Sequence, residues 1–278
     1  MGNNNWVVEN LNNALSTWNG KLQEIWQLLL TSPEEFRGGS IWSIILHIHD
    51  ALKATGFALL VLFFVLGVVK TTMSLQELKR PEHAVRLLLR FVLAKALVTY
   101  GMDLMLALFR IAQGVVSSIA GSLGSASGLL ATLPNEVEAA ITGASFWESI
   151  PLWIVTLLGS LLITILSFII IMTVYGRYFS LYMYAAIAPI PLAAFAGEGT
   201  AQIGTQFLKS YAGVCLQGAI IVLACVIFTA FAAAPPAVTG SGAVQMVWNY
   251  VAELVFNLLV LIGTVKMSER LCKDMLGL

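Results

Sequence analysis

Residues 210–252 read SYAGVCLQGAIIVLACVIFTAFAAAPPAVTGSGAVQMVWNYVA, forty-three positions without a charged side chain. Two more uncharged stretches cover residues 149–176 and 178–197. A water-soluble domain cannot hide so much apolar chain, because a folded core still needs a polar surface. In a bilayer, about 20 consecutive apolar residues cross the hydrocarbon as one helix. The sequence therefore predicts an all-α polytopic membrane protein.

The overall composition supports the same class. Of the 278 residues, 58% are hydrophobic and 11% are charged, whereas a soluble domain has about 25% charged residues. The 15 basic and 15 acidic residues cancel, so no net field attracts nucleic acid or acidic substrates. The three cysteines form no CxxC pair, and we expect free thiols packed as small apolar groups.

Five apolar stretches are long enough to cross a membrane as helices. They are residues 51–69, 87–115, 150–175, 211–233 and 244–265. We expect Gly176 and Arg177 to end the third span on the cytoplasmic side. Basic residues concentrate at residues 70–90 and after residue 265, whereas residues 117–148 contain acids but no lysine or arginine. The positive-inside rule places the basic segments in the cytoplasm and residues 117–148 outside.

The number of crossings depends on residues 178–208. Pro189 and Pro191 remove two amide donors and favour an extended conformation at the residue before each of them. If the chain turns back there as a re-entrant hairpin, Lys209 and the basic tail stay inside the cell. If it crosses, they end outside. We predict five spans plus this hairpin, in the cytoplasmic membrane, with the N-terminus outside and the C-terminus inside. Six spans remain the alternative.

The N-terminal segment has the pattern of an amphipathic helix. Apolar residues recur at heptad spacing: Leu11, Leu15, Trp18, Leu22, Ile25 and Leu29. One interpretation is a seam between subunits or an interfacial helix. The other is a helix that folds back onto its own bundle. The predicted organisation is thus an external helical segment (1–39), two spans with a basic cytoplasmic loop (40–116), an external loop (117–148), and three spans with the hairpin and tail (149–278).

Charged residues inside the predicted spans are the main functional signal, because lipid does not accept them. Lys95, Asp103 and Arg110 fall within a sector of roughly 80° if the second span is one helix. Glu253 lies near the middle of the fifth span, at a depth that matches Lys95. We predict that Glu253 pairs with Lys95, or with the Arg110 and Asp103 network of a neighbouring subunit. Such a network either fixes helix register or lines a translocation route.

The basic loop gives a second group of candidates, Lys79, Arg80, Arg86 and Arg90. These residues suit phosphates of a passing nucleic acid, or else they set topology and contact anionic lipid. The aromatic residues Tyr175, Tyr178, Phe179, Tyr182 and Tyr184 flank the hairpin. They form either an interfacial belt or a constriction or docking surface around the prolines.

Signatures of enzymes are missing from the sequence. It contains no GxxxxGK[ST], HExxH or GxSxG motif. His47, His49 and Asp50 are close in sequence, but residues two apart on a helix do not face each other. We interpret them as polar interfacial residues, and we expect no enzyme activity, bound metal or cofactor.

The layout resembles the TrbL-like polytopic membrane subunit of type IV secretion systems, in versions carried by integrative elements of Gram-positive bacteria. The resemblance rests on the external N-terminal helix, the loop LKRPEH (78–83), the external connection before the third span, and YMYAAIAPIPLAAF (182–195) followed by FLKSY (207–211). It covers most of residues 40–270. The short external loop departs from relatives with a large external domain.

The resemblance implies a homo-oligomeric membrane channel or scaffold for conjugation. Its expected partners are further copies of itself, other secretion subunits including cytoplasmic ATPases, membrane lipid, and single-stranded DNA with its relaxase in transit. The alternative is a small-molecule transporter or permease component. Inverted repeats would support that alternative, but the two halves of the chain differ in charge, loop length and number of spans.

Overall fold

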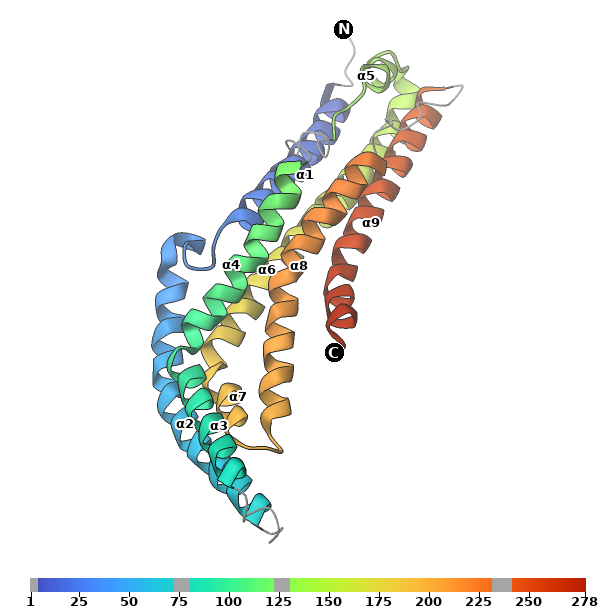
Figure 1. The fold of residues 1–278 in the computed structure, drawn as a ribbon. Coiled ribbons are helices and arrows are strands. Elements are labelled where there is room, and N and C mark those ends of the chain that lie inside the picture. Colours follow the sequence, from blue (N-terminus) through green and yellow to red (C-terminus); the bar gives the residue numbers. More distant parts are fainter. Residues whose placement is uncertain (1–4, 73–80, 123–130, 232–241) are drawn as a thin grey trace. The chain divides into compact units, whose positions relative to one another are not determined.

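The computed structural model describes residues 5–72, 81–122, 131–231 and 242–278. Every regular element in these ranges is a helix (Figure 1). The elements are α1 (Asn5–Leu30), η1 (Phe36–Gly39), α2 (Ser40–Thr72), α3 (Pro81–Thr99), α4 (Gly101–Ser122), α5 (Asn135–Thr142), α6 (Phe146–Ile187), α7 (Pro189–Ala193), η3 (Ala194–Ala196), α8 (Ala201–Phe231) and α9 (Ala243–Leu276).

Five of the described helical segments are long and apolar enough to cross a membrane. They are Phe36–Lys70, Gly101–Gly121, Trp147–Ile187, Ala201–Phe231 and Ala243–Leu276. The predicted class, an all-α polytopic membrane protein with about five spans, is confirmed. The physical reason is that a helix satisfies its own backbone hydrogen bonds, which lipid cannot do.

The described chain divides into two compact units. Unit 1 comprises Met1–Leu30, Ser117–Tyr175 and Ile220–Ser268, and unit 2 comprises Thr31–Val116, Gly176–Ala219 and Glu269–Leu278. The helices α4, α6, α8 and α9 each contribute residues to both.

In unit 1, the apolar seam of α1 is buried within the same chain. Its six members are between 0% and 3% exposed: Leu11, Leu15, Trp18, Leu22, Ile25 and Leu29. The helix packs against α5, and the ring of Trp6 lies 6.1 Å from that of Trp153 on α6. The structure thus favours the interpretation in which the helix folds back onto its own bundle. A second subunit is not needed to cover the seam.

Residues 131–134, which form no helix, contact both α1 and α9 within unit 1. The side-chain amide of Asn19 donates to the carbonyl of Ala131 and accepts from its N–H, each at 2.9 Å. The hydroxyl of Tyr250 on α9 donates to the carbonyl of Thr132 at 3.1 Å. These contacts satisfy main-chain groups that lack a helical partner. The predicted external loop at 117–148 is accordingly partly helical, since α4 extends into it and α5 lies within it.

In unit 2, α7 and η3 pack against α2 and α3. Glycines on α2 allow this close approach. A Cβ at Gly56 would lie 2.8 Å from the carbonyl oxygen of Pro189, and one at Gly67 would lie 3.4 Å from the Cα of Gly197. Any larger side chain at Gly56 would therefore push α7 away from α2.

The structure around Pro189 and Pro191 differs from the predicted hairpin in two respects. Its first limb is not separate, because α6 continues without interruption to Ile187 and has 42 residues. The residue before Pro189 is also not extended, since Ala188 has φ −49° and ψ −38°. Both prolines occupy the first turn of α7, where amide donors have no helical partner anyway. The chain leaves helical geometry at Gly197 instead, with φ −100° and ψ 142°.

The predicted second span is also not one helix. It is divided at Tyr100 into α3 and α4, although the Tyr100 N–H still donates to Ala96 and the Leu104 N–H to Tyr100. Gly101 lies where a Cβ would be 3.0 Å from Leu192 Cδ1. Only α4 qualifies as a candidate span by itself. The common sector predicted for Lys95, Asp103 and Arg110 assumed one continuous helix, and it stays a prediction.

Replacing Leu22 with alanine should destabilise the protein, because a buried leucine leaves a cavity when truncated. Leu22 is 1% exposed, whereas Leu30 on the same helix is 48% exposed. We expect Leu22→Ala to cost about 2–5 kcal/mol and the matched Leu30→Ala to change stability by less than about 0.5 kcal/mol. Denaturant unfolding of the detergent-solubilised protein measures both. Equal losses would contradict packing of the seam within the chain.

Candidate functional site

The most unusual group in unit 2 is the guanidinium of Arg177, which is 2% exposed. Its Nε donates to the carbonyl of Val214 and its Nη2 to the carbonyl of Cys215, each at 3.1 Å. These carbonyls lie within α8 and still have a lone pair free beside their helical bonds. The Nη1 atom is buried without a hydrogen-bond partner in the described part of the chain.

The surroundings of this cation are aromatic and small rather than acidic. The guanidinium carbon lies 5.8 Å from the ring centre of Phe109 and 6.0 Å from that of Tyr178, and ring faces attract cations. A Cβ at Gly218 would lie 2.5 Å from the guanidinium carbon. Gly218 therefore provides the space in which the guanidinium is seated.

Arg177 holds α6 and α8 together in an antiparallel arrangement. On α8 it contacts residues 214–218. Tyr184 lies two turns further along α6 and contacts Phe207 and Tyr211, which come earlier in α8, so the two helices run in opposite directions. The helix α6 does not end at Arg177 as expected, because it continues for ten residues beyond it. The end of the membrane crossing near Arg177 stays a prediction. The sequence did contain a signal for the burial of Arg177, because this residue is a single charge between two uncharged stretches (149–176 and 178–197).

A second buried polar group in unit 2 is His49 on α2, which is 1% exposed. Its Nδ1 lies 2.7 Å from the carbonyl oxygen of Ala185. Because a carbonyl only accepts, Nδ1 carries the proton. The Nε2 atom is buried without a partner in the described chain. His49 was expected at the membrane interface as a polar capping residue, and the structure instead uses it to join α2 to α6.

Two tyrosines of α6 hold the segment after α1. The hydroxyl of Tyr178 donates to the carbonyl of Thr31 at 2.8 Å, and that of Tyr182 donates to the carbonyl of Pro33 at 3.0 Å. The ring of Phe36 stacks on Tyr178 with centroids 4.5 Å apart. Both tyrosines are buried, so these two form neither an interfacial belt nor an exposed constriction. They anchor the N-terminal segment.

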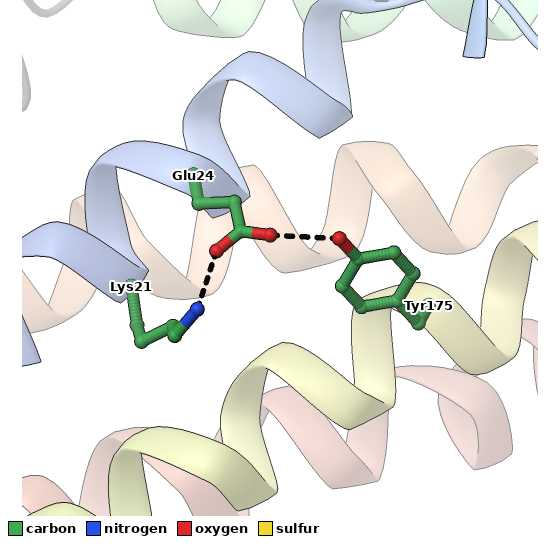
Figure 2. Close-up of polar contacts among 3 residues, drawn as sticks. All are labelled: Lys21, Glu24 and Tyr175. Atoms are coloured by element: carbon green, nitrogen blue, oxygen red, sulfur yellow. Dashed lines mark hydrogen bonds and ion pairs between the residues drawn. The ribbon is translucent and has the colours of Figure 1, made fainter. Parts of the chain in front are cut away.

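In unit 1, a polar contact also joins α1 to α6. Glu24 accepts a hydrogen bond from the hydroxyl of Tyr175 and pairs with Lys21, both at 2.7 Å (Figure 2). Glu24 bridges the two because each of its carboxylate oxygens has a different donor. About a third of the Glu24 side chain is exposed, so solvent weakens the ion pair. Lys21 lies on α1 like Glu24 itself, so of these two contacts it is the hydrogen bond to Tyr175 that fixes α1 on α6.

The predicted intramembrane charges are distributed over both units. Lys95 on α3 and Asp103 on α4 are exposed. Arg110 on α4 lies 3.6 Å from Glu34, which belongs to unit 2 as well. Glu253 lies on α9 in unit 1. The pairing of Glu253 with Lys95 remains a prediction, and the partner found for Arg110 is one that the sequence pattern did not indicate.

Of the predicted basic loop, Lys79 and Arg80 lie outside the described residues. Arg86 is exposed on α3. Arg90 forms an ion pair with Glu198 at 2.9 Å, and the ammonium of Lys70 lies near Gly199. The turn after η3 therefore lies beside the end of α2 and the middle of α3. Arg86 keeps its charge open to solvent, whereas Arg90 is engaged by the turn.

Comparison with known proteins gives one match. Residues 18–189 match the family model described as TrbL/VirB6 plasmid conjugal transfer like protein. No curated protein and no solved structure matches the chain. The matched range covers more than half of the chain and includes α1 from Trp18 onward, the anchoring tyrosines, Arg177 and the first proline of α7.

Replacing Gly218 with alanine should destabilise unit 2 although alanine favours helices. The new Cβ would collide with the guanidinium of Arg177 and force a buried cation out of its hydrogen bonds, a loss of roughly 1–3 kcal/mol. The matched control is Gly176→Ala, because nothing lies within 4 Å of that position. It should be neutral or stabilising by up to about 1 kcal/mol. Thermal unfolding in detergent compares the two, and equal effects would contradict the seating of Arg177 against Gly218.

The hydrogen bond between Tyr175 and Glu24 should appear as a coupling energy. We expect Tyr175→Phe and Glu24→Gln to be non-additive by about 1.5 kcal/mol, since the bond involves a charged acceptor. A double-mutant cycle by denaturant unfolding isolates this pairwise value from the other contacts of either residue. Additive effects would show that the contact does not hold α1 in place.

Proposed function

This chain belongs to the TrbL/VirB6 plasmid conjugal transfer family, and we propose that it is a homo-oligomeric channel or scaffold subunit that helps move single-stranded DNA with its attached protein across the cytoplasmic membrane. Membership identifies a multi-pass membrane component of conjugal transfer and type IV secretion. The observation that carries the proposal is the family match over residues 18–189 in a chain with five apolar helices of membrane-spanning length.

The proposed division of labour gives the energy-supplying step to other subunits. Cytoplasmic ATPases of the same system would power transfer, and the lack of a GxxxxGK[ST] nucleotide-binding loop in the sequence agrees with this. The chain itself would supply a membrane platform. With the basic segments in the cytoplasm, Arg86, Arg90 and the C-terminal tail face the side from which DNA arrives.

Arg86 is the described residue best suited to meet the DNA backbone. Phosphates attract exposed cations, and Arg86 on α3 is exposed. Arg90, one turn further along, is engaged with Glu198 at 2.9 Å and would serve to hold α3 to the turn after η3. The two arginines thus have separate proposed roles, contact for Arg86 and positioning for Arg90.

Contacts between copies would use a face other than the seam of α1, which its own chain already covers. The helix α3 offers such a face. Its apolar side chains Val85, Leu88, Leu89, Val92 and Leu93 are between 55% and 65% exposed. This helix is too rich in charge to be a candidate span by itself, so a neighbouring copy rather than lipid alone is the proposed cover for this face.

Deleting the chain from a donor strain should abolish conjugation, and a plasmid copy should restore it. Arg86→Gln should lower transfer by up to about fivefold, because one exposed ionic contact contributes up to about 1 kcal/mol. The matched control is Arg270→Gln, which should leave transfer unchanged, since Arg270 is 86% exposed but already lies 3.9 Å from the carboxylate of Asp274 on its own helix. Counts of recombinant recipients per donor measure the effect, with protein levels checked by immunoblot.

Two outcomes would contradict the proposal. Unchanged transfer after deletion of the chain would exclude a role in the channel. A purified particle whose protein mass equals one 30.0 kDa chain would exclude the homo-oligomer, and mass photometry of the detergent-extracted protein gives that mass.

A further inference from the structure

We propose that unit 1 contains a binding site for an anionic phospholipid, in which an acyl chain lies in an apolar groove between α6 and α9 and the ammonium of Lys266 contacts the headgroup phosphate. The site goes beyond the proposed function, because it concerns lipid recognition by a single chain and does not depend on DNA transfer.

The groove is formed by one face of α6 and one residue of α9. It is lined by Ile165, Phe168, Ile169, Met172, Thr173 and Lys266 and has a volume of about 490 Å³. This volume is within the range of about 300–1,000 Å³ that is usual for ligand sites. Phe168 and Met172 are 53% and 68% exposed, so in a membrane the apolar wall meets lipid directly.

Lys266 supplies the charge at this otherwise apolar surface. It is exposed and takes part in no ion pair within the described residues. The next basic residues of α9 differ, because Arg270 lies 3.9 Å from Asp274 and Lys273 lies 2.7 Å from Glu269. An acid from the chain therefore neutralises Lys273 but not Lys266. The ammonium of Lys266 is therefore available to an anionic group from outside the described chain.

The position of the groove along both helices fits the headgroup region. The predicted spans end at residue 175 on α6 and at residue 265 on α9, so Thr173 and Lys266 both lie at the end of a predicted crossing. A lysine at that depth extends its ammonium toward the interface while its methylene chain stays in apolar surroundings. The predicted cytoplasmic side is also where anionic lipid concentrates and attracts basic residues.

A phospholipid explains both properties of the site with one molecule. Its acyl chain covers the exposed side chains of Phe168 and Met172, and its phosphate pairs with Lys266. A free phosphate would leave the apolar wall uncovered. A second copy of the chain would need to bring an acid to Lys266 along with its apolar surface. Charge complementarity together with the apolar wall therefore favours the lipid.

The test is lipid binding to the purified full-length protein in detergent, measured by native mass spectrometry with phosphatidylglycerol and phosphatidylcholine of identical acyl chains. Wild type should prefer phosphatidylglycerol by about fivefold, the effect of one lysine near an anionic headgroup. Lys266→Gln should remove the preference, and Lys273→Gln should keep it. Met172→Trp, which fills the groove, should weaken binding of both lipids.

Several results would overturn the proposal. One is a preference for phosphatidylglycerol that is unchanged in Lys266→Gln, and another is an equal loss of that preference in Lys273→Gln. Full competition by inorganic phosphate would indicate a site for a free anion. Disulfide-linked dimers of Phe168→Cys in membranes would show that a second copy covers the groove. Melting temperatures of all variants confirm that they fold. Because no step involves conjugation, failure here is separate from failure of the proposed channel role.

Discussion

The constraint on which the structure depends is that lipid offers no hydrogen bonds to a main chain. Each peptide group in the bilayer needs a partner within the protein, and a helix provides one for every group except those at its ends. The apolar residues of the chain therefore lie in long helices. The longest described helix is α6, with 42 residues. At about 1.5 Å per residue it is roughly twice as long as the hydrocarbon is thick. Pro189 and Pro191 follow this rule too, because they begin α7 instead of interrupting a helix.

The same constraint explains why a charge can be buried at Arg177. Burying a cation is costly unless polar or polarisable groups surround it. The carbonyls of α8 and the rings of Phe109 and Tyr178 supply them, and Gly218 supplies the space. Such a contact has one acceptable geometry, so it sets the register of α6 against α8 within unit 2. In the proposed role as a membrane platform, fixed registers of this kind would keep the shape of the chain while other subunits drive transport.

The N-terminal segment shows how an amphipathic helix is used in this fold. In unit 1 its apolar side is buried in the chain, and Tyr175 bonds to Glu24 (Figure 2). In unit 2, Tyr178 and Tyr182 hold the residues that follow it. Tyrosine suits this task because its ring packs as an apolar group while its hydroxyl satisfies a carbonyl. Apolar surface that remains exposed, on α3 and along the groove beside Lys266, is then available to other chains and to lipid.

The sequence by itself determined the class of fold and the five apolar spans, because these depend on composition and on the length of uncharged stretches, which need no partner. It also determined the family, because that resemblance lies in the residues themselves. It also indicated that the residues at heptad spacing on α1 would be buried. Only the tertiary structure decided what buries them, since a heptad pattern is the same whether the neighbour is the same chain or another. It likewise decided that Arg177 is buried, that His49 joins two helices and that the second span breaks at Tyr100. Each of these depends on glycines and carbonyls from distant segments, Gly218 and Gly101 among them, and spacing along one helix carries no information about what another helix brings beside it.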